Sequence, residues 1–387
     1  MNKIISESFR RLETYVSRED YKGWDPYDGL NSKIFASIPF LNSNKIAKLV
    51  WIQFFKRSLL NLRKPLMVEK QYNPKGVALF LEGYCNLYNL SGDLKHLEMI
   101  HHFAAMLIKL NSDGWSGNCW GYNFDWQARA FFQPKYGPTV VATCYAANAL
   151  INAYEITGNR EYLEFALSSK DFVTKDLNRT YDADGDFAFS YSPMDNTQVF
   201  NASLLGSRLL SRIYTYTGEE ELKKLAKSSV LFCIKHQKPD GSWSYGTLSF
   251  HQWIDNFHTG YNLECLKAYS KYCSDDSIYS VIEKGFEYYV HTFFSKQGQP
   301  KYYHNKMYPI DTQNTAQLVL TLSKLDKFDE YQKLADRVLI WTIQNMQDNQ
   351  GFFFYQNHKY YTIKIPYMRW TQAWMFYAMS EYLKKYN

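Results

Sequence analysis

The pattern of apolar and polar positions repeats along this chain. In five segments an apolar helix ends, a short polar turn follows and an amphipathic helix begins: YNLSGDLKHL, YEITGNREYL, YTYTGEEELKKL, YCSDDSIYSVI and LDKFDEYQKLA. Gly92, Gly158 and Gly218 stand in the first three turns, where glycine readily takes the left-handed conformation that ends a helix. The equivalent turns near Ser274 and Lys327 have no glycine. The repeat predicts helical hairpins joined in series.

The two helices of each hairpin have different apolar patterns. Residues 140–153 read VVATCYAANALINA, which is small and apolar on nearly every side and is typical of a fully buried helix. The helix after Gly218 places its apolar residues on one face, with lysines opposite. The pattern therefore predicts inner helices that alternate with outer helices.

Counting these pairs leads to a fold class. Further helices are expected over residues 4–18 and 45–61, and another opens near Pro74. The total is about six hairpins, the number in an all-α (α/α)6 toroid. We expect a single domain over residues 1–387, in which residues 1–40 form an N-terminal helix and loop that pack on the ring.

The connections differ in length, and this difference locates a site. Short turns join inner to outer helices at one end of the ring, so all long loops lie at the other end. The N-termini of the inner helices share that end and direct their free N–H groups toward it. We therefore expect chemistry at this mouth.

Five of the long loops contain a glycine turn followed by an aromatic residue: LNSDGWSG, TYDADGDFAFSY, QKPDGSWSYG, SKQGQPKYYH and MQDNQGFFFYQ. The third resembles the QW motif of terpene cyclases, in which a glutamine caps a helix and lies against a tryptophan. A structural role, the stapling of adjacent hairpins, explains these turns without any chemistry.

Carboxylates recur just before the inner helices. Asp125, Asp195, Asp255 and Asp311 occupy nearly equivalent positions in successive units. Converging carboxylates suit general acid/base work on a sugar, so these four residues are catalytic candidates. The alternative is that each aspartate only caps its helix. Catalysis predicts that the four side chains open on one cavity together with His258.

The spacing of Asp255, His258 and Tyr261 places them on one helix face, where a histidine beside a carboxylate can transfer protons. Asp195 or Asp311 would supply the opposing carboxylate for glycoside cleavage, which needs two carboxyl groups about 5–10 Å apart. Epimerisation or elimination beside a uronate would instead need a base, an acid and a cation.

Aromatic, basic and acidic side chains of the same loops are candidates for substrate binding. They are Trp126, Arg129, Tyr191, Trp253, Tyr261, Tyr303, His304, Arg369, Trp370, Asp25 and Asp28.

Composition narrows the partners. The chain has 33 Tyr, 26 Phe and 10 Trp, which suits walls on which sugar rings stack but also a cavity for a greasy chain. The net charge of +6 is spread without a basic stripe, so a nucleic acid is not expected, whereas an anionic substrate is compatible. The substrate would be an oligosaccharide or a lipid-linked glycan.

Localisation and cofactors follow from what the sequence lacks. The six cysteines form no CxxC pair, the N-terminus has no signal-peptide core, and no apolar run is long enough to cross a bilayer. We expect a cytoplasmic protein and leave peripheral membrane association open. The DxDD and DDxxD motifs, zinc-ligand patterns and glycine-rich phosphate loops are absent, so neither a metal nor a cofactor is expected.

Several segments resemble a bacterial family of α/α-toroid proteins encoded among polysaccharide-biosynthesis genes: GYNFDWQAR, FSYSPMDNTQVFNASLLG, QKPDGSWSYG, WIDNFHTGYNLE and KYYHNKMYPIDTQNTAQ. That family lies near the terpenoid-cyclase/prenyltransferase toroids and the six-hairpin glycosidases. The resemblance implies a role in surface-glycan assembly. It supports a glycan-processing enzyme (a hydrolase, lyase or epimerase), while an isoprenoid-handling toroid and a non-catalytic glycan-binding scaffold stay open as alternatives.

Overall fold

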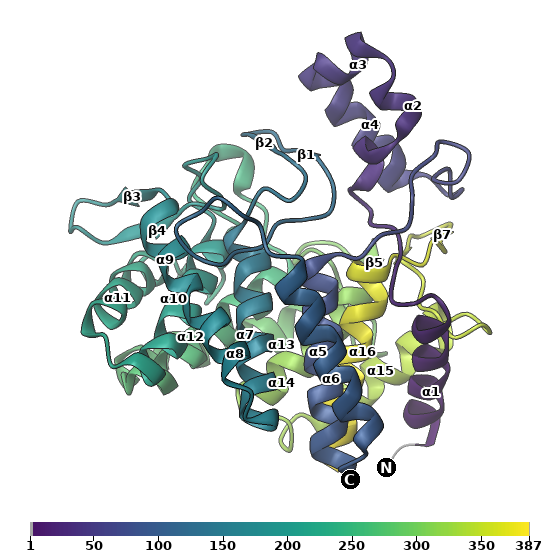
Figure 1. Cartoon of the computed structure of the whole chain (residues 1–387). Coiled ribbons are helices and arrows are strands. Elements are labelled where there is room, and N and C mark those ends of the chain that lie inside the picture. The colour runs from purple at the N-terminus through teal and green to yellow at the C-terminus, as the bar shows by residue number, and fades with distance from the viewer. Residues whose placement is uncertain (1–2, 387) are drawn as a thin grey trace.

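Six inner helices form a closed ring in the computed structural model, which describes residues 3–386. Each inner helix packs against the next, and the last packs against the first (Figure 1). They are α5 (Pro74–Ser91), α7 (Val140–Thr157), α10 (Phe200–Thr217), α12 (Asn256–Cys273), α14 (Thr312–Lys324) and α16 (Trp374–Tyr386). A π-helical turn, η5 (Met368–Ala373), leads into α16.

Outer helices surround this ring. They are α1 (Lys3–Arg18), α6 (Leu94–Lys109), α8 (Arg160–Leu167) with α9 (Ser169–Asp171) and η2 (Phe172–Asp176), α11 (Glu220–Ile234), α13 (Tyr279–Phe293) and α15 (Gln332–Met346). The chain is an all-α (α/α)6 toroid, as the sequence predicted.

The sixth hairpin joins the two ends of the chain. Helix α1 packs on α16 and α15 and is the outer partner of the last inner helix. The helix expected over 45–61 is present as α4 (Lys45–Arg57), but it lies outside the ring (Figure 1). Including it among the ring hairpins was therefore wrong. Its exposed apolar residues do not pack against an inner helix.

The three predicted glycines do end inner helices. Gly92, Gly158 and Gly218 are the C-caps of α5, α7 and α10, each in the left-handed conformation, with φ between 64° and 69°. Ser274 ends α12 in the same conformation without being a glycine. The hairpin geometry therefore does not depend on glycine at every turn.

The glycine turns of the long loops staple neighbouring units. In the QW-like loop, Gln237 Nε2 donates to Gly241 O at 3.1 Å and to Val281 O of α13 at 2.9 Å. Gln347 repeats this arrangement, with bonds to Gly351 O at 2.9 Å and to Ser8 O of α1 at 3.0 Å. The same device thus fastens α1 in its outer position.

The strands are short and lie in the long loops. β1 (Trp126–Gln127) pairs with β2 (Phe132–Gln133), and β3 (Arg179–Tyr181) pairs with β4 (Phe187–Phe189). β6 (Gln356–Asn357) pairs with both β5 (Ile310–Asp311) and β7 (Thr362–Ile363). All pairs are antiparallel.

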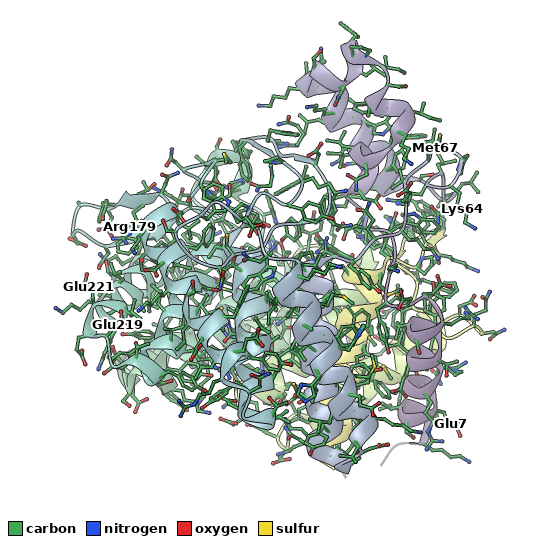
Figure 2. All side chains as sticks on the ribbon, in the orientation of Figure 1. Glu7, Lys64, Met67, Arg179, Glu219 and Glu221 are labelled. Carbon is green, nitrogen blue, oxygen red and sulfur yellow. The ribbon has the colours of Figure 1, made fainter. Side chains whose placement is uncertain are left out.

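A helical projection stands above the ring on the side of these loops (Figures 1 and 2). It comprises η1 (Asp28–Asn31), α2 (Lys33–Ala36), α3 (Pro39–Ser43) and α4. Leu30, Phe35 and Ile52 form its own small core, against which Trp51 packs. No helix within residues 3–386 has the length and apolar character needed to span a membrane.

Closure of the ring makes one glycine sensitive to substitution. A Cβ at Gly83 of α5 would lie 2.5 Å from the Phe376 ring of α16. Because neither helix can withdraw without opening the ring, we expect Gly83→Ala to lower the free energy of unfolding by about 1–3 kcal/mol in urea denaturation.

The control for this variant is Gly76→Ala in the same helix, where the nearest atom, Arg369 Cβ, would lie at an ordinary 3.4 Å. Equal stability of the two variants would contradict a tight α5–α16 contact.

Candidate functional site

A cavity of about 1130 Å³ opens at the mouth where the inner helices begin. Each of the six inner units contributes a side chain to it from its first turns: Lys75, Val141, Asn201, His258, Gln313 and Arg369. The remaining wall comes from α4 and the long loops. The cavity therefore lies at the mouth to which the loop lengths pointed.

His258 lies on the wall with Asp255 behind it. Asp255 is the N-cap of α12, and its Oδ1 accepts from His258 N at 3.0 Å. Its Oδ2 accepts from His258 Nδ1 at 2.7 Å and from Trp253 Nε1 at 2.9 Å. Because a carboxylate only accepts, Nδ1 carries the proton and the neutral ring has its lone pair on Nε2. Nε2 has no partner within residues 3–386.

A second histidine lies close to the first. The Tyr245 ring stacks on Trp253 at 4.5 Å and contacts His258 at 4.6 Å and His251 at 5.1 Å between ring centroids. Burial, reinforced by the charge of Arg129, lowers the pKa of His251 and favours its neutral form. We had not singled out His251, although it precedes His258 by seven residues in one loop segment.

Lys75 was also missed by the sequence analysis. It follows Pro74 at the start of α5, is only 4% exposed and lies over the rings of Tyr145, Tyr261 and Trp374 at 4.3, 5.3 and 5.1 Å. Its ammonium makes no ion pair with a carboxylate among the described residues. Burial, with the nearby Arg369 charge, holds the pKa of Lys75 well below its usual range.

Asp311 has a structural role. It caps α14 through Gln313 N at 3.0 Å and accepts from Gln356 Nε2 at 2.8 Å and from Trp370 Nε1 at 3.2 Å. It is fully buried behind Trp370, and burial raises its pKa to about 6.

Asp195 and Asp125 are turned toward their own loops. Asp195 accepts from the backbone and hydroxyl groups of Ser192 and Thr197, while Asp125 accepts from Lys135 N at 2.6 Å. We expected these carboxylates and His258 to open on one cavity, but of this set only His258 lines it. The aspartates satisfy backbone N–H groups and do not line the cavity.

The two N-terminal aspartates form buried ion pairs. Asp25 holds Arg369 in two bonds of 2.5 and 2.8 Å, and Asp28 accepts from Arg63 Nε at 2.8 Å. Burial raises the pKa of Asp28 to about 6. Neither Asp25 nor Asp28 lines the cavity, and Asp25 already balances the charge of Arg369.

Most of the other binding candidates do lie on the wall: Trp126, Arg129, Tyr191, Trp253, Tyr261, Tyr303, Arg369 and Trp370. His304 does not, because its Nδ1 lies against Ile254 O at 3.3 Å. Burial and the Asp255 charge raise the pKa of Tyr303 to about 12, so its hydroxyl remains a donor near neutral pH.

The ionisable side chains of the cavity wall other than histidine and tyrosine are all basic. They are Lys56, Arg57, Lys75, Arg129 and Arg369, of which Arg369 is paired with Asp25 behind the wall. No Asp or Glu of residues 3–386 lines the cavity. Nor is any group of three His, Cys, Asp or Glu side chains in that range placed to hold a metal ion. The arrangement offers a histidine base, protonated tyrosines, cations and flat aromatic surfaces.

No family model matches the sequence, and no curated protein does. Among solved structures, the whole chain resembles the whole of a cellobiose 2-epimerase from Bacillus thermoamylovorans, at 12% identity and a TM-score of 0.68. A GH76 α-mannanase from Bacteroides thetaiotaomicron has a TM-score of 0.61 at 12% identity, covering 82% of this chain and 88% of its own. An unsaturated glucuronyl hydrolase specific for heparin has a TM-score of 0.56 at 14% identity, covering 81% and 86%. These likenesses establish the toroid fold; they give no support to the polysaccharide-gene family or to a terpenoid cyclase.

Replacing Lys75 tests the electrostatics of the cavity floor. Since its pKa is depressed on folding, the unfolded chain binds more protons in the window between the folded pKa and about 10.4, and stability rises with pH across that window. We expect Lys75→Met to be more stable than the parent at pH 7, by about 1–3 kcal/mol, with the gap closing toward pH 10. Thermal unfolding from pH 6 to 10 measures this.

Lys95→Met, which changes an exposed lysine of α6, is the control and should show no such pH-dependent gap. A gap that does not vary with pH in Lys75→Met would contradict the depressed pKa.

Proposed function

We propose that this protein is a glycan-processing enzyme that transfers a proton at a sugar carbon next to a carbonyl or carboxylate group, as in epimerisation. The observation that carries the proposal is the Asp255–His258 pair. Asp255 binds Nδ1 of His258, the ring nitrogen Nε2 stays free within residues 3–386, and His258 lines an aromatic cavity. The carboxylate orients the ring and stabilises the imidazolium that forms when Nε2 takes a proton.

No carboxylate of residues 3–386 lines the cavity, and this separates the proposed reaction from glycoside hydrolysis. Hydrolysis by the common route needs two carboxyl groups that both reach the glycosidic bond. Asp195 and Asp311, the residues considered for that role, are engaged in caps and turns. Proton transfer at carbon needs only the base, an acid and a group that stabilises the enolate.

The residues on the wall account for each step. His258 Nε2 removes the proton, and the electron pair of the C–H bond moves to the carbonyl to form an enolate. Lys75 stabilises the enolate oxygen by donating a hydrogen bond, and the negative charge favours its ammonium form. Return of a proton from the opposite side inverts the carbon; Tyr303, which lines the cavity and keeps its hydroxyl proton near neutral pH, is our candidate acid and would regain that proton from solvent.

The walls suit a sugar with negative charge. Trp126, Trp253 and Trp370 provide flat surfaces for pyranose rings, and the surrounding cations favour a carboxylate or phosphate on the substrate. The resemblance of the loop segments to the polysaccharide-gene family supports a role in cytoplasmic surface-glycan metabolism. The structural likeness to a cellobiose 2-epimerase supports epimerisation over elimination.

Solvent exchange tests the chemistry. The protein would be incubated in D2O with reducing disaccharides and uronate oligosaccharides, and deuterium at carbon followed by mass spectrometry and NMR. We expect exchange that falls about 10²–10⁴-fold in His258→Ala, because the base is lost. We expect a smaller loss, about 10–100-fold, in Asp255→Asn, which keeps the cap but weakens the orientation of the ring.

His291→Ala, on the outer face of α13, serves as the control for loss of a histidine. Exchange that survives in His258→Ala would remove this residue from the mechanism. Binding of the sugars by the parent without any exchange would favour a glycan-binding scaffold, and binding of prenyl diphosphates instead of sugars would favour the isoprenoid alternative.

A further inference from the structure

The projection formed by α2, α3 and α4 differs in composition from the rest of the surface. Residues 29–68 contain seven Lys or Arg and no Asp or Glu. Nine of the twenty exposed large hydrophobic side chains of the described chain lie in residues 34–67. Phe40 and Ile46, at 74% and 70% exposure, are the most prominent of them near the tip. A cluster of exposed apolar side chains beside basic ones marks an interaction site.

One face of α4 joins the tip of the projection to the cavity. Ile46, Val50 and Phe54 are spaced by four residues, so they lie on one face, and all three are exposed. Val50 and Phe54 also line the cavity. A continuous apolar track therefore runs from the tip of the projection into the mouth of the ring.

Cations accompany this track. Within residues 3–386, no carboxylate forms an ion pair with Lys45, Lys48, Arg57 or Lys64. Lys64 and Met67 lie at the base of the projection, where it joins the ring (Figure 2). Lys56 and Arg57 follow the apolar stripe directly and line the cavity. Moving inward, the order is apolar side chains, then cations, then the aromatic cavity.

We propose that this projection docks on an anionic lipid bilayer and holds the mouth of the ring against the membrane. Phe40 and Ile46 enter the interface while the lysines contact acidic headgroups. The order of groups along α4 matches a glycan carried on a membrane lipid through a phosphate, with the lipid chain on the apolar stripe, the phosphate at Lys56 and Arg57 and the sugar in the cavity. This substrate class rests on the proposed function; the docking does not.

Charge favours a bilayer over a second copy of this chain. A symmetric pairing of the projection would place uncompensated lysines of two copies near one another. An anionic membrane instead attracts each such cation, and exposed apolar side chains add to this by insertion. The projection has both cations that are unpaired within residues 3–386 and exposed apolar side chains, on a short unit with its own small core.

Binding to vesicles of phosphatidylcholine with about 30% phosphatidylglycerol, which have a negative surface charge, tests the docking. We expect the full chain to sediment with these vesicles. Phe40→Asp/Ile46→Asp should lose at least about tenfold in affinity, because the apolar insertion is lost. Lys45→Glu/Lys48→Glu should bind the anionic vesicles more weakly than the parent. Binding of this variant should also fall less steeply with added salt, because fewer of its cations contact headgroups. Leu94→Asp/Tyr279→Asp, at exposed apolar positions near the short turns at the opposite end of the ring, should bind like the parent.

A fluorescent label gives an independent measurement. All six native cysteines are buried, so a Phe40→Cys variant can be labelled selectively with a polarity-sensitive dye. We expect a blue shift of its emission on adding the vesicles and none for the same label at Tyr279→Cys, at the opposite end of the ring. Absence of vesicle binding, equal binding by Phe40→Asp/Ile46→Asp, or a dimer of the parent that this variant abolishes would overturn the proposal. Because no sugar enters these measurements, their failure leaves the proton-transfer chemistry untouched.

Discussion

Helices that are apolar on nearly every side can be kept from water only by burying all their faces at once. In this chain each inner helix does so against two inner neighbours and the outer helices around them, and the ring closes because α16 meets α5. Closure needs a sixth outer helix, which α1 supplies from the opposite end of the chain. Once the ring is closed, all inner-helix N-termini and long loops lie at one mouth, and the position of the cavity follows.

The same capping interaction serves stability and chemistry. Asp255 and Asp311 both begin an inner helix and both accept backbone N–H bonds within the first turn. The residue three positions further on is His258 in one helix and Asn314 in the other. Cap geometry brings that residue next to the carboxylate, so only the first pair can move a proton. The distinction between a helix cap and a reactive pair therefore depends on a single neighbouring side chain.

The cavity and the projection form one continuous surface. Basic side chains line the mouth and no carboxylate of the described residues does, and α4 extends this surface with apolar side chains away from the ring. Closure of the core does not explain why Phe40 and Ile46 are exposed, nor why residues 29–68 contain no acidic residue. These features become coherent if the mouth faces an anionic, partly apolar partner.

The sequence by itself determined what depends on local interactions. Helix periodicity, the turns ended by Gly92, Gly158 and Gly218, and the alternation of inner and outer helices all depend on residues a few positions apart, and together they specify the toroid. The spacing of Asp255 and His258 likewise determined their contact, because a cap and its third residue are neighbours on any helix. Tertiary structure alone decided the pairing of α1 with α16, the position of α4 outside the ring, and which side chains face the cavity. Lys75 and His251 have no distinctive local pattern. Asp311 accepts from Gln356 and Trp370, and Lys75 lies over Tyr145 and Trp374. These contacts join residues far apart in the chain, so their geometry exists only once the ring has closed.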